Sequence, residues 1–337
     1  MLSDRRQRVL AVLIEEYVAQ ALPVGSRTLT ERYNLGVSSA TVRNELSYLE
    51  DAGYISQPHT SAGRIPTDLG YRTFVDNLLA NGAIKDGEGD RELVERLKSS
   101  ASELDELLDS ASNALARLTD CLSIVVAPLA RTATVKQITL ISLSDRQAVV
   151  VVVTKDGQVY NRQMEFAEAV EPERLSEVQR ILNDFFAGRS ARDVKMSAEG
   201  LSNHYFGNPL VRLVIDEIIA CLHEHDTAHA YRIGMSSLAR KPEFSESSAL
   251  IPIMQVLEDD AVLLQILDPT SDADRGAPMV RIGSENPTEQ LSGVSVVANR
   301  YGRGDSAGVV AVIGPTRMDY SRVLKAVRIA SAALDED

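Results

Sequence analysis

Hydroxyl, guanidinium and amide side chains crowd the start of one short helical segment, and together they have the chemistry needed to contact DNA. In the segment SSATVRNELSYLED, the first turns carry Ser38, Ser39, Thr41, Arg43 and Asn44. Arginine can pair with guanine through two hydrogen bonds, and asparagine can pair with adenine in the same way. Hydroxyls and amides at a helix N-terminus can hold a phosphate. We therefore expect base-edge and backbone contacts from this helix.

A short hairpin is predicted directly after the helix. Tyr54-Ile55-Ser56 and Arg64-Ile65-Pro66 have the composition of two strands around the tip QPHTSAG. We expect four of its residues to reach the DNA backbone or the minor groove: His59, Thr60, Ser61 and Arg64. The alternative is structural, with the serines only capping the helix and the polar side chains solvated.

Three helices must position these residues. Apolar residues repeat at helical spacing between Val9 and Val18, and Pro23 and Gly25 are expected to end this first helix. A second helix starts at Ser26 or Thr28. The third has an inward face formed by Val42, Leu46 and Leu49, and Gly53 stops it. Three short helices followed by a hairpin predict a winged helix-turn-helix over residues 1–79.

Charge is distributed unevenly along the chain. Residues 1–75 hold eight arginines, no lysine and eight acidic residues, whereas the whole chain carries a net charge of −13. DNA binding needs local positive potential, which only the neutral N-terminal segment could supply. An acidic balance also simply keeps a protein soluble, so charge alone does not favour DNA binding.

Composition points to a soluble, cytoplasmic protein of two or three domains. The chain has 337 residues, of which 44% are hydrophobic and 25% charged. Cys121 and Cys221 sit in apolar helical patterns and suggest no disulfide framework. The N-terminus lacks the apolar core of a signal peptide, and the longest apolar run, AVVVVV at 148–153, is too short to span a bilayer. We expect no membrane association.

A linker and a long helix follow the first domain. The glycine-rich, charged segment 80–90 is predicted to be the linker. From Leu97 to Leu122, leucines and alanines alternate at spacings of four and three, which predicts a heptad seam. Such a helix either pairs with its twin in a dimer or lies against the next domain. Alanines in the seam favour docking within the protomer.

The remaining chain alternates strands and helices. Strands are predicted at Val135–Leu143, Gln147–Thr154 and Gln158–Phe166, and helices at about 171–187 and 208–224. Further predictions are strands at Tyr231–Met235, Val262–Leu267, Met279–Ile282, Val294–Arg300 and Gly308–Gly314, and helices at about 245–258 and Tyr320–Leu334. Because the strands stop and then resume, we predict one domain, 91–165 with 229–337, that is split by an insertion at 166–228.

Catalytic and metal-binding patterns are scarce. His223, His225 and His229 are spaced by two and four residues, which does not place all three on one helix face, and no cysteines support a metal site. Neither a phosphate-binding glycine loop nor a nucleophile elbow occurs in the sequence. We expect no enzyme activity, no catalytic residues, no metal and no cofactor.

At three places the sequence resembles the heat-inducible transcription repressor HrcA family. They are SSATVRNELSYLEDAGYISQPHTSAGRIPTDLGYR near the start, MSSLARKPEF at 235–244 and VVAVIGPTRMDYSRVLKAV at 309–327. Since these motifs lie near both ends and in the middle, the resemblance covers essentially the full chain.

The resemblance implies a fold class, a function and partners. It implies an α+β multidomain protein with a winged helix, a GAF-like α/β domain and an inserted dimerisation domain. It also implies a homodimeric repressor of chaperone operons that binds an inverted-repeat operator called CIRCE, with activity dependent on the GroEL chaperonin and lost on heat stress. The DNA-reading positions of the family fall on Arg43, Asn44, His59 and Arg64. The alternative is a winged-helix regulator gated by a small effector in the GAF-like domain.

Overall fold

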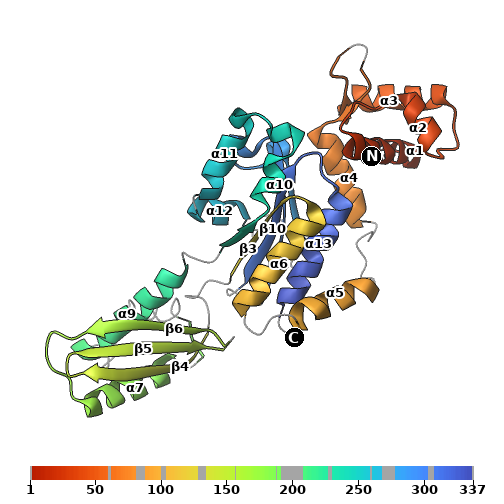
Figure 1. The fold of residues 1–337 in the computed structure, drawn as a ribbon. Coiled ribbons are helices and arrows are strands. Elements are labelled where there is room, and N and C mark those ends of the chain that lie inside the picture. The colour runs from red at the N-terminus through yellow and green to blue at the C-terminus, as the bar shows by residue number, and fades with distance from the viewer. Residues whose placement is uncertain are drawn as a thin grey trace. The chain divides into compact units, whose positions relative to one another are not determined.

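The structure, a computed structural model, is mixed α+β and divides into two units (Figure 1). One unit comprises Met1–Val125, Tyr231–Tyr301 and Val309–Asp337, and the other Val126–Ala230 and Gly302–Gly308. The residues described are 2–59, 62–80, 88–99, 104–127, 134–155, 157–186, 188–190, 208–226, 230–258, 260–267, 278–302 and 307–335. Thr60, Ser61 and most of the predicted linker 80–90 lie outside these ranges.

The N-terminal elements agree closely with the predicted winged helix. They are α1 (Asp4–Gln20), α2 (Ser26–Arg32), α3 (Ser39–Asp51), β1 (Ile55–Ser56), β2 (Ile65–Pro66) and α4 (Asp68–Ala80). The first helix ends earlier than predicted, at Gln20, because Ala21 adopts a left-handed conformation that closes it. The strands β1 and β2 pair antiparallel, with Ile55 opposite Pro66.

A five-stranded sheet forms the centre of the rest of this unit. Its strand order is β7-β3-β10-β9-β8. The strands are β7 (Ala230–Ile233), β3 (Leu122–Val126), β10 (Gly308–Pro315), β9 (Val294–Tyr301) and β8 (Met279–Ile282). Every residue of β3 and of β10 is buried, so these strands are covered on both faces.

Helices complete this part of the unit. They are α5 (Glu88–Ser99), α6 (Leu104–Thr119), α10 (Met235–Ala239), α11 (Ser247–Glu258), α12 (Asp260–Leu267) and α13 (Tyr320–Leu334). Short 3₁₀ turns lie at Pro242–Phe244, Gly283–Glu285 and Glu289–Leu291. The final helix α13 has the predicted bounds, and it packs on β9.

The predicted long helix between Leu97 and Leu122 is divided in the structure. Its residues belong to α5 and α6, and Leu122 begins β3 instead of ending a helix. The apolar stripe is nevertheless real, because Leu108, Ala111 and Leu115 are buried. Both helices pack on α13 of the same chain. The seam therefore docks within the protomer.

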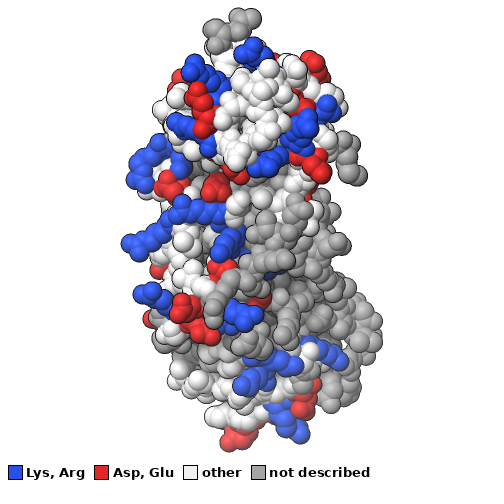
Figure 2. All heavy atoms as spheres, turned by 90° about the vertical axis from the view of Figure 1, so that its right-hand side faces the viewer, with Lys and Arg blue, Asp and Glu red and all other residues white. Residues whose placement is uncertain are grey.

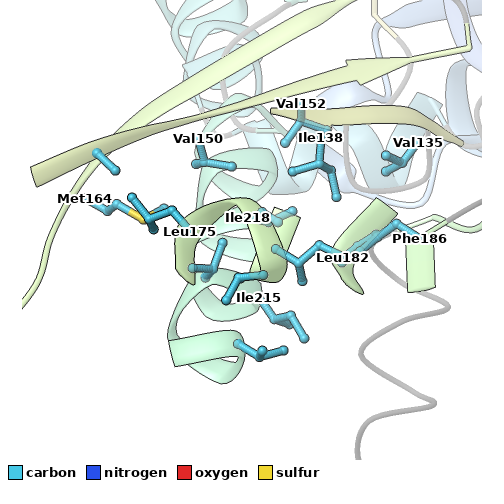
Figure 3. Close-up of a cluster of buried hydrophobic side chains, with 14 of the residues drawn as sticks. Val135, Ile138, Val150, Val152, Met164, Leu175, Leu182, Phe186, Ile215 and Ile218 are labelled. Atoms are coloured by element: carbon cyan, nitrogen blue, oxygen red, sulfur yellow. The ribbon is translucent and has the colours of Figure 1, made fainter. Parts of the chain in front are cut away.

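The second unit pairs a three-stranded antiparallel sheet with two helices. The strands β4 (Val135–Ser144), β5 (Gln147–Thr154) and β6 (Val159–Glu165) lie in sequence order. Their buried face packs on α7 (Pro172–Phe186) and α9 (Pro209–Asp226). Figure 3 shows Ile138 and Val150 from the sheet meeting Leu182 and Ile218 from the helices in one apolar core.

This arrangement differs from the predicted boundaries, which placed residues 135–165 in the split domain and began the insertion at 166. The strands β4 to β6 form their own sheet and share a core with α7 and α9. The physical reason is the alternation in β5, where Ala148, Val150 and Val152 point to the face that these two helices cover. The unit that contains the predicted insertion thus begins near Val126.

The predicted strand Val262–Leu267 was wrong, because this segment lies in α12. A short apolar run has no periodicity that separates a strand from a buried helix. Here Leu263, Ile266 and Leu267 are buried at the spacings of three and four that a helix places on one face, and α12 packs against α11.

Candidate nucleic-acid interface

Apolar residues fix the direction in which α3 presents its polar face. Val42, Leu46 and Leu49 are buried against the rest of the winged helix, with exposed fractions of 0%, 3% and 0%. This face contacts α1 and α2. The opposite face of α3 is exposed and includes Arg43 and Asn44, as predicted. Rotation of α3 would expose its buried apolar stripe to water. The helix therefore holds its polar residues in a fixed direction.

The outward face of α3 carries the two side chains best suited to reading bases. Within the described ranges, neither the Arg43 nor the Asn44 side chain has a hydrogen-bond or ion-pair partner. Both side chains are therefore available to an external partner. The exposed face continues one turn further with Ser47 and Tyr48, two residues absent from the predicted set. Extending the helical period from Arg43 and Asn44 would have found them.

Arg43 is exceptional among the eight arginines of residues 1–75. In the part of the chain that the structure describes, it is the only one of the eight whose guanidinium contacts neither an acid nor a carbonyl. The other contacts are Arg5 and Arg6 with Glu45, Arg8 with the Asn34 carbonyl, Arg27 with Glu31, Arg32 with Glu16, Arg64 with Glu50, and Arg72 with Glu285. Among the described residues, five of these seven arginines thus pair with acids of the same segment, whereas Arg43 pairs with none.

The first turn of α3 is held by its own hydroxyl groups. The backbone N–H of Thr41 donates to Ser38 Oγ at 3.2 Å, and the two side-chain oxygens lie 3.1 Å apart. Ser38 is therefore the N-cap of α3, which is the structural role considered for it from the sequence. Ser39 follows as the first helical residue and is half-buried. Capping leaves the exposed Ser38 hydroxyl at the helix end where an anion is favoured.

The wing is fixed to the helices by backbone contacts. Val24 and Arg64 exchange two backbone hydrogen bonds of 2.8 Å, which add a bridge to the β1–β2 pair. Gly63 allows this close approach, since a Cβ there would lie 2.6 Å from the backbone of Pro23 and Val24. His59, on the tip of the wing, is exposed as predicted.

Arg64 is predicted to reach the DNA backbone or the minor groove, and in the structure it forms an ion pair with Glu50. Its Nη2 lies 2.8 Å and its Nε 3.1 Å from Glu50 Oε2, near the end of α3. The Arg64 side chain is about one quarter exposed. The pair joins the wing to α3, and it offsets the positive charge that Arg64 would offer to a phosphate.

A second cluster extends the exposed surface of α3 towards α1. The Arg6 guanidinium lies 3.4 Å from the centre of the Tyr48 ring, and its Nε is 2.9 Å from Glu45 Oε2. This is cation–π geometry, with the carboxylate fixing the direction of the guanidinium. The Tyr48 side chain nevertheless keeps 44% of its surface exposed.

On the face that Figure 2 shows, the described basic and acidic residues are interspersed and form no single basic patch. Figure 2 shows lysines and arginines next to aspartates and glutamates on the side that faces the viewer, including its upper end.

Of the residues described, none form a group of three or more His, Cys, Asp or Glu that could hold a metal ion. The side chains of His223, His225 and His229 lie outside the described set. Within the described ranges, no helix has the length and apolar character needed to cross a membrane.

Comparison with known proteins points to the same family over most of the chain. The model of the HrcA protein C-terminal domain matches residues 105–324. A heat-inducible transcription repressor HrcA from Streptomyces avermitilis is 38% identical, with 97% of this chain and 96% of that protein covered. One from Nocardioides sp. is 37% identical, with 100% of each chain covered.

A solved structure shows the same fold over nearly the same length. It is described as the crystal structure of a hypothetical protein, is 27% identical and has a TM-score of 0.67. The alignment covers 99% of this chain and 98% of that one.

Together the winged helix and the relatives define the class of protein, a transcription repressor whose function implies DNA binding. The chain belongs to the HrcA family of heat-inducible transcription repressors.

Proposed function

We propose that this chain is a homodimeric, cytoplasmic repressor of chaperone operons that binds an inverted-repeat operator of the CIRCE type through α3. The observation that carries the proposal is the outward face of α3. There Arg43 and Asn44 are exposed and have no protein partner among the described residues, although the arginines around them are paired.

The residues divide by role. Arg43 and Asn44 read base edges in the major groove, where each can make paired hydrogen bonds. Phosphate contacts come from the start of α3 and from the tip of the wing. These residues are Ser38, Ser39 and Thr41 on the helix and His59, Thr60 and Ser61 on the wing. Tyr48 extends the surface by one turn.

For Arg64, the ion pair with Glu50 adds a second role to the predicted DNA contact. Its pair with Glu50 supports an indirect contribution, in which Arg64 holds the wing against α3 in the free protein. Contact of Arg64 with a phosphate would require this pair to open.

A dimer is needed because one neutral winged helix offers little electrostatic attraction to DNA. A two-fold dimer presents two α3 helices and matches an inverted repeat. We assign dimerisation to the unit Val126–Ala230. This assignment is supported by the apolar face of the sheet that points away from the core. Val149, Val151 and Val153 of β5 lie on this face. Beside them are Ile141 and Val159, which are 48% and 58% exposed.

Release of the operator by heat rests on the family resemblance. In this mechanism a GroEL-type chaperonin keeps the repressor folded, and a shortage of free chaperonin leaves it inactive. Repression itself is steric exclusion of the polymerase from the promoter.

The alternative, a regulator gated by a small effector in the GAF-like domain, has less support. We take the part of the first unit that contains the five-stranded sheet as the GAF-like domain. All residues of β3 and β10 are buried, and their side chains pack the space on both faces of the sheet. A filled apolar core of this kind is not what a polar effector needs.

An equilibrium titration tests the proposal. Purified full-length protein is titrated with an inverted-repeat duplex from a chaperone promoter and with a duplex of the same bases in random order, over a salt series. We expect preference for the inverted repeat of roughly 10³-fold or more at physiological salt. Adding chaperonin and ATP should raise the active fraction without changing the affinity of the active protein. Equal affinity for the two duplexes would exclude the specific repressor.

A further inference from the structure

Three segments that are far apart in the sequence join the winged helix to the body that carries the five-stranded sheet. They are the start of α4, the turn Gly283–Glu285 with β8, and the IGPTRMDY segment before α13. All lie in the same unit of the chain. Polar contacts between them involve backbone groups as well as side chains, so their geometry is directional.

The first contact is made by two charged residues of α4, one turn apart. Asp68 Oδ2 accepts hydrogen bonds from the backbone N–H of Ser284 at 2.9 Å and from the Ser284 hydroxyl at 2.8 Å. Arg72 forms an ion pair with Glu285 through Nε and Nη2, and Nη2 also donates to the Val280 carbonyl at 2.6 Å.

The turn that receives Asp68 is shaped for it. Gly283 has a φ of +52°, and a Cβ at this position would overlap the Asp68 carboxylate. A side chain here would be strained by the backbone and would also push Asp68 away. Glu285 in turn accepts a hydrogen bond of 2.9 Å from the backbone N–H of Ile282, which holds it in place for Arg72.

The second contact is made by Arg317, from the middle of IGPTRMDY. Its Nη1 donates to the Val18 carbonyl at 2.8 Å, and its Nε lies 2.7 Å from Glu243 Oε1. Val18 is in the last turn of α1, where carbonyls lack a partner within the helix. A cation there also interacts favourably with the helix dipole. Two of the segments that carry the family resemblance, MSSLARKPEF and IGPTRMDY, thus meet at the end of α1.

Two buried tyrosines fill the space near these contacts. The rings of Tyr71, in α4, and Tyr320, at the start of α13, lie 5.7 Å apart, and both are almost completely buried. The Tyr320 hydroxyl donates to the Thr316 carbonyl at 2.8 Å and lies 2.7 Å from Ser295 Oγ. Burial raises the pKa of both phenols, so they stay neutral and the contact keeps its apolar character.

We propose that Asp68, Arg72 and Arg317 are positioning residues that hold the winged helix in one orientation on the body and thereby set the half-site spacing of the operator. The inference rests on the proposed function, because it needs a dimer and an inverted repeat. In a two-fold dimer, the separation of the two α3 helices is fixed only if each winged helix is fixed on the body of its own protomer. One added base pair shifts a half-site by about 3.4 Å and rotates it by about 35°. Winged helices joined flexibly to the body would still bind both half-sites after this change in spacing. Winged helices held in one orientation would not.

The test is a titration on duplexes with different spacers. The inverted repeat is prepared with its natural spacer and with one, two and five base pairs added, together with a duplex that carries a single half-site. The proteins are wild type, Arg317→Ala, Arg72→Glu, and the exchanged pair Arg72→Glu with Glu285→Arg. Lys325→Ala is the matched control, because it removes an ion pair with Asp90 inside the body. Melting curves establish first that each variant is folded, and Arg72→Lys replaces Arg72→Glu if the latter does not fold.

Wild type and Lys325→Ala should prefer the natural spacer by roughly tenfold or more over the others. In Arg317→Ala and Arg72→Glu this preference should fall to within about threefold, while the affinity for the single half-site stays within about twofold of wild type. The exchanged pair restores the ion pair but not the bonds to the Val280 carbonyl and the Ile282 N–H, so it should recover part of the spacer preference.

Two results would overturn the inference. One is unchanged spacer preference in both folded single variants. The other is an equal loss of affinity on every duplex, the half-site included, which would indicate a general effect on folding. Failure of wild type to prefer any inverted repeat would instead overturn the proposed function, so the wild-type and variant titrations separate the two failures.

Discussion

At the scale of single residues, Arg43 and Arg64 show how the same side chain acquires different roles within one small domain. Both were predicted to contact DNA, since each lies in the segment rich in polar residues. Arg43 is exposed and has no partner among the described residues, whereas Arg64 is held by Glu50. The difference arises from the tertiary position of an acid, and it decides which cation is free for a ligand.

This pairing predicts the effect of removing the acid. Glu50→Gln should release the Arg64 guanidinium toward a phosphate and also remove one negative charge from the surface. We expect the affinity for operator and random duplex to rise by the same factor, roughly three- to tenfold, and the salt slope to steepen by about one. Glu95→Gln on α5, an exposed glutamate, removes the same charge elsewhere and serves as the control. A changed ratio of the affinities for operator and random duplex would contradict a phosphate contact by the released Arg64.

The exposure of Arg43 and Asn44 was predictable from the sequence, and the pairing of Arg64 was not. The buried stripe of α3 repeats locally, so its outward face follows from the helical period. The Arg64–Glu50 contact joins residues 14 positions apart across two kinds of element. The contacts of Arg72 and Arg317 span 213 and 299 positions, and no local pattern announces them.

At the scale of elements, α1 has two functions that its sequence pattern does not separate. Its apolar stripe packs under α3, and the carbonyl of Val18 in its last turn receives Arg317. Glu15, three residues before Val18 in α1, is close enough to Asp319 for the two charges to interact. Asp319 is the N-cap of α13, where its Oδ1 accepts from the Arg322 backbone N–H at 3.0 Å. The contact between α1 and the body therefore includes a repulsion between two carboxylates.

This repulsion predicts a dependence of stability on pH. Burial and then the charge of Asp319 raise the pKa of Glu15 in the folded protein. The protonated form is therefore favoured by folding, and this stabilisation is present at low pH and lost as the pH rises through the folded pKa. Glu15→Gln should raise the melting temperature at pH 7 by about 1–2 °C. The difference should disappear near pH 4, and a difference that grows on acidification would contradict the prediction.

Elements with a clear period were predicted well, and short apolar runs were not. The bounds of α13 and β8 agree with the sequence prediction, and β5 does too, because its alternating valines are unambiguous. The strand β3 was missed because Leu122 also fits the apolar stripe of the preceding helix. The segment 262–267 was given the wrong type for a related reason, since its residues are apolar without a diagnostic period. Which sheet a strand joins depends on distant partners, so the separate sheet β4-β5-β6 was not foreseen.

At the scale of the whole molecule, the chain combines a neutral N-terminal segment with an acidic remainder. Residues 1–75 have balanced charges, and the net charge of −13 belongs to the rest. An acidic body does not attract DNA, and this suppresses binding away from the operator. In the proposed dimer, specific binding comes from base contacts made by both winged helices at once.

The measurement that tests this account most directly compares base preferences of wild type and Asn44→Ala. Each position of the inverted repeat is substituted in turn, and the affinity of both proteins is measured on every duplex. Wild type should lose about 1–3 kcal/mol at each base pair that α3 reads. Asn44→Ala should be indifferent at one base pair in each half-site, placed symmetrically about the centre, and should keep the wild-type preferences elsewhere. Preference profiles of the two proteins that superimpose at every position would contradict the claim that α3 reads the operator.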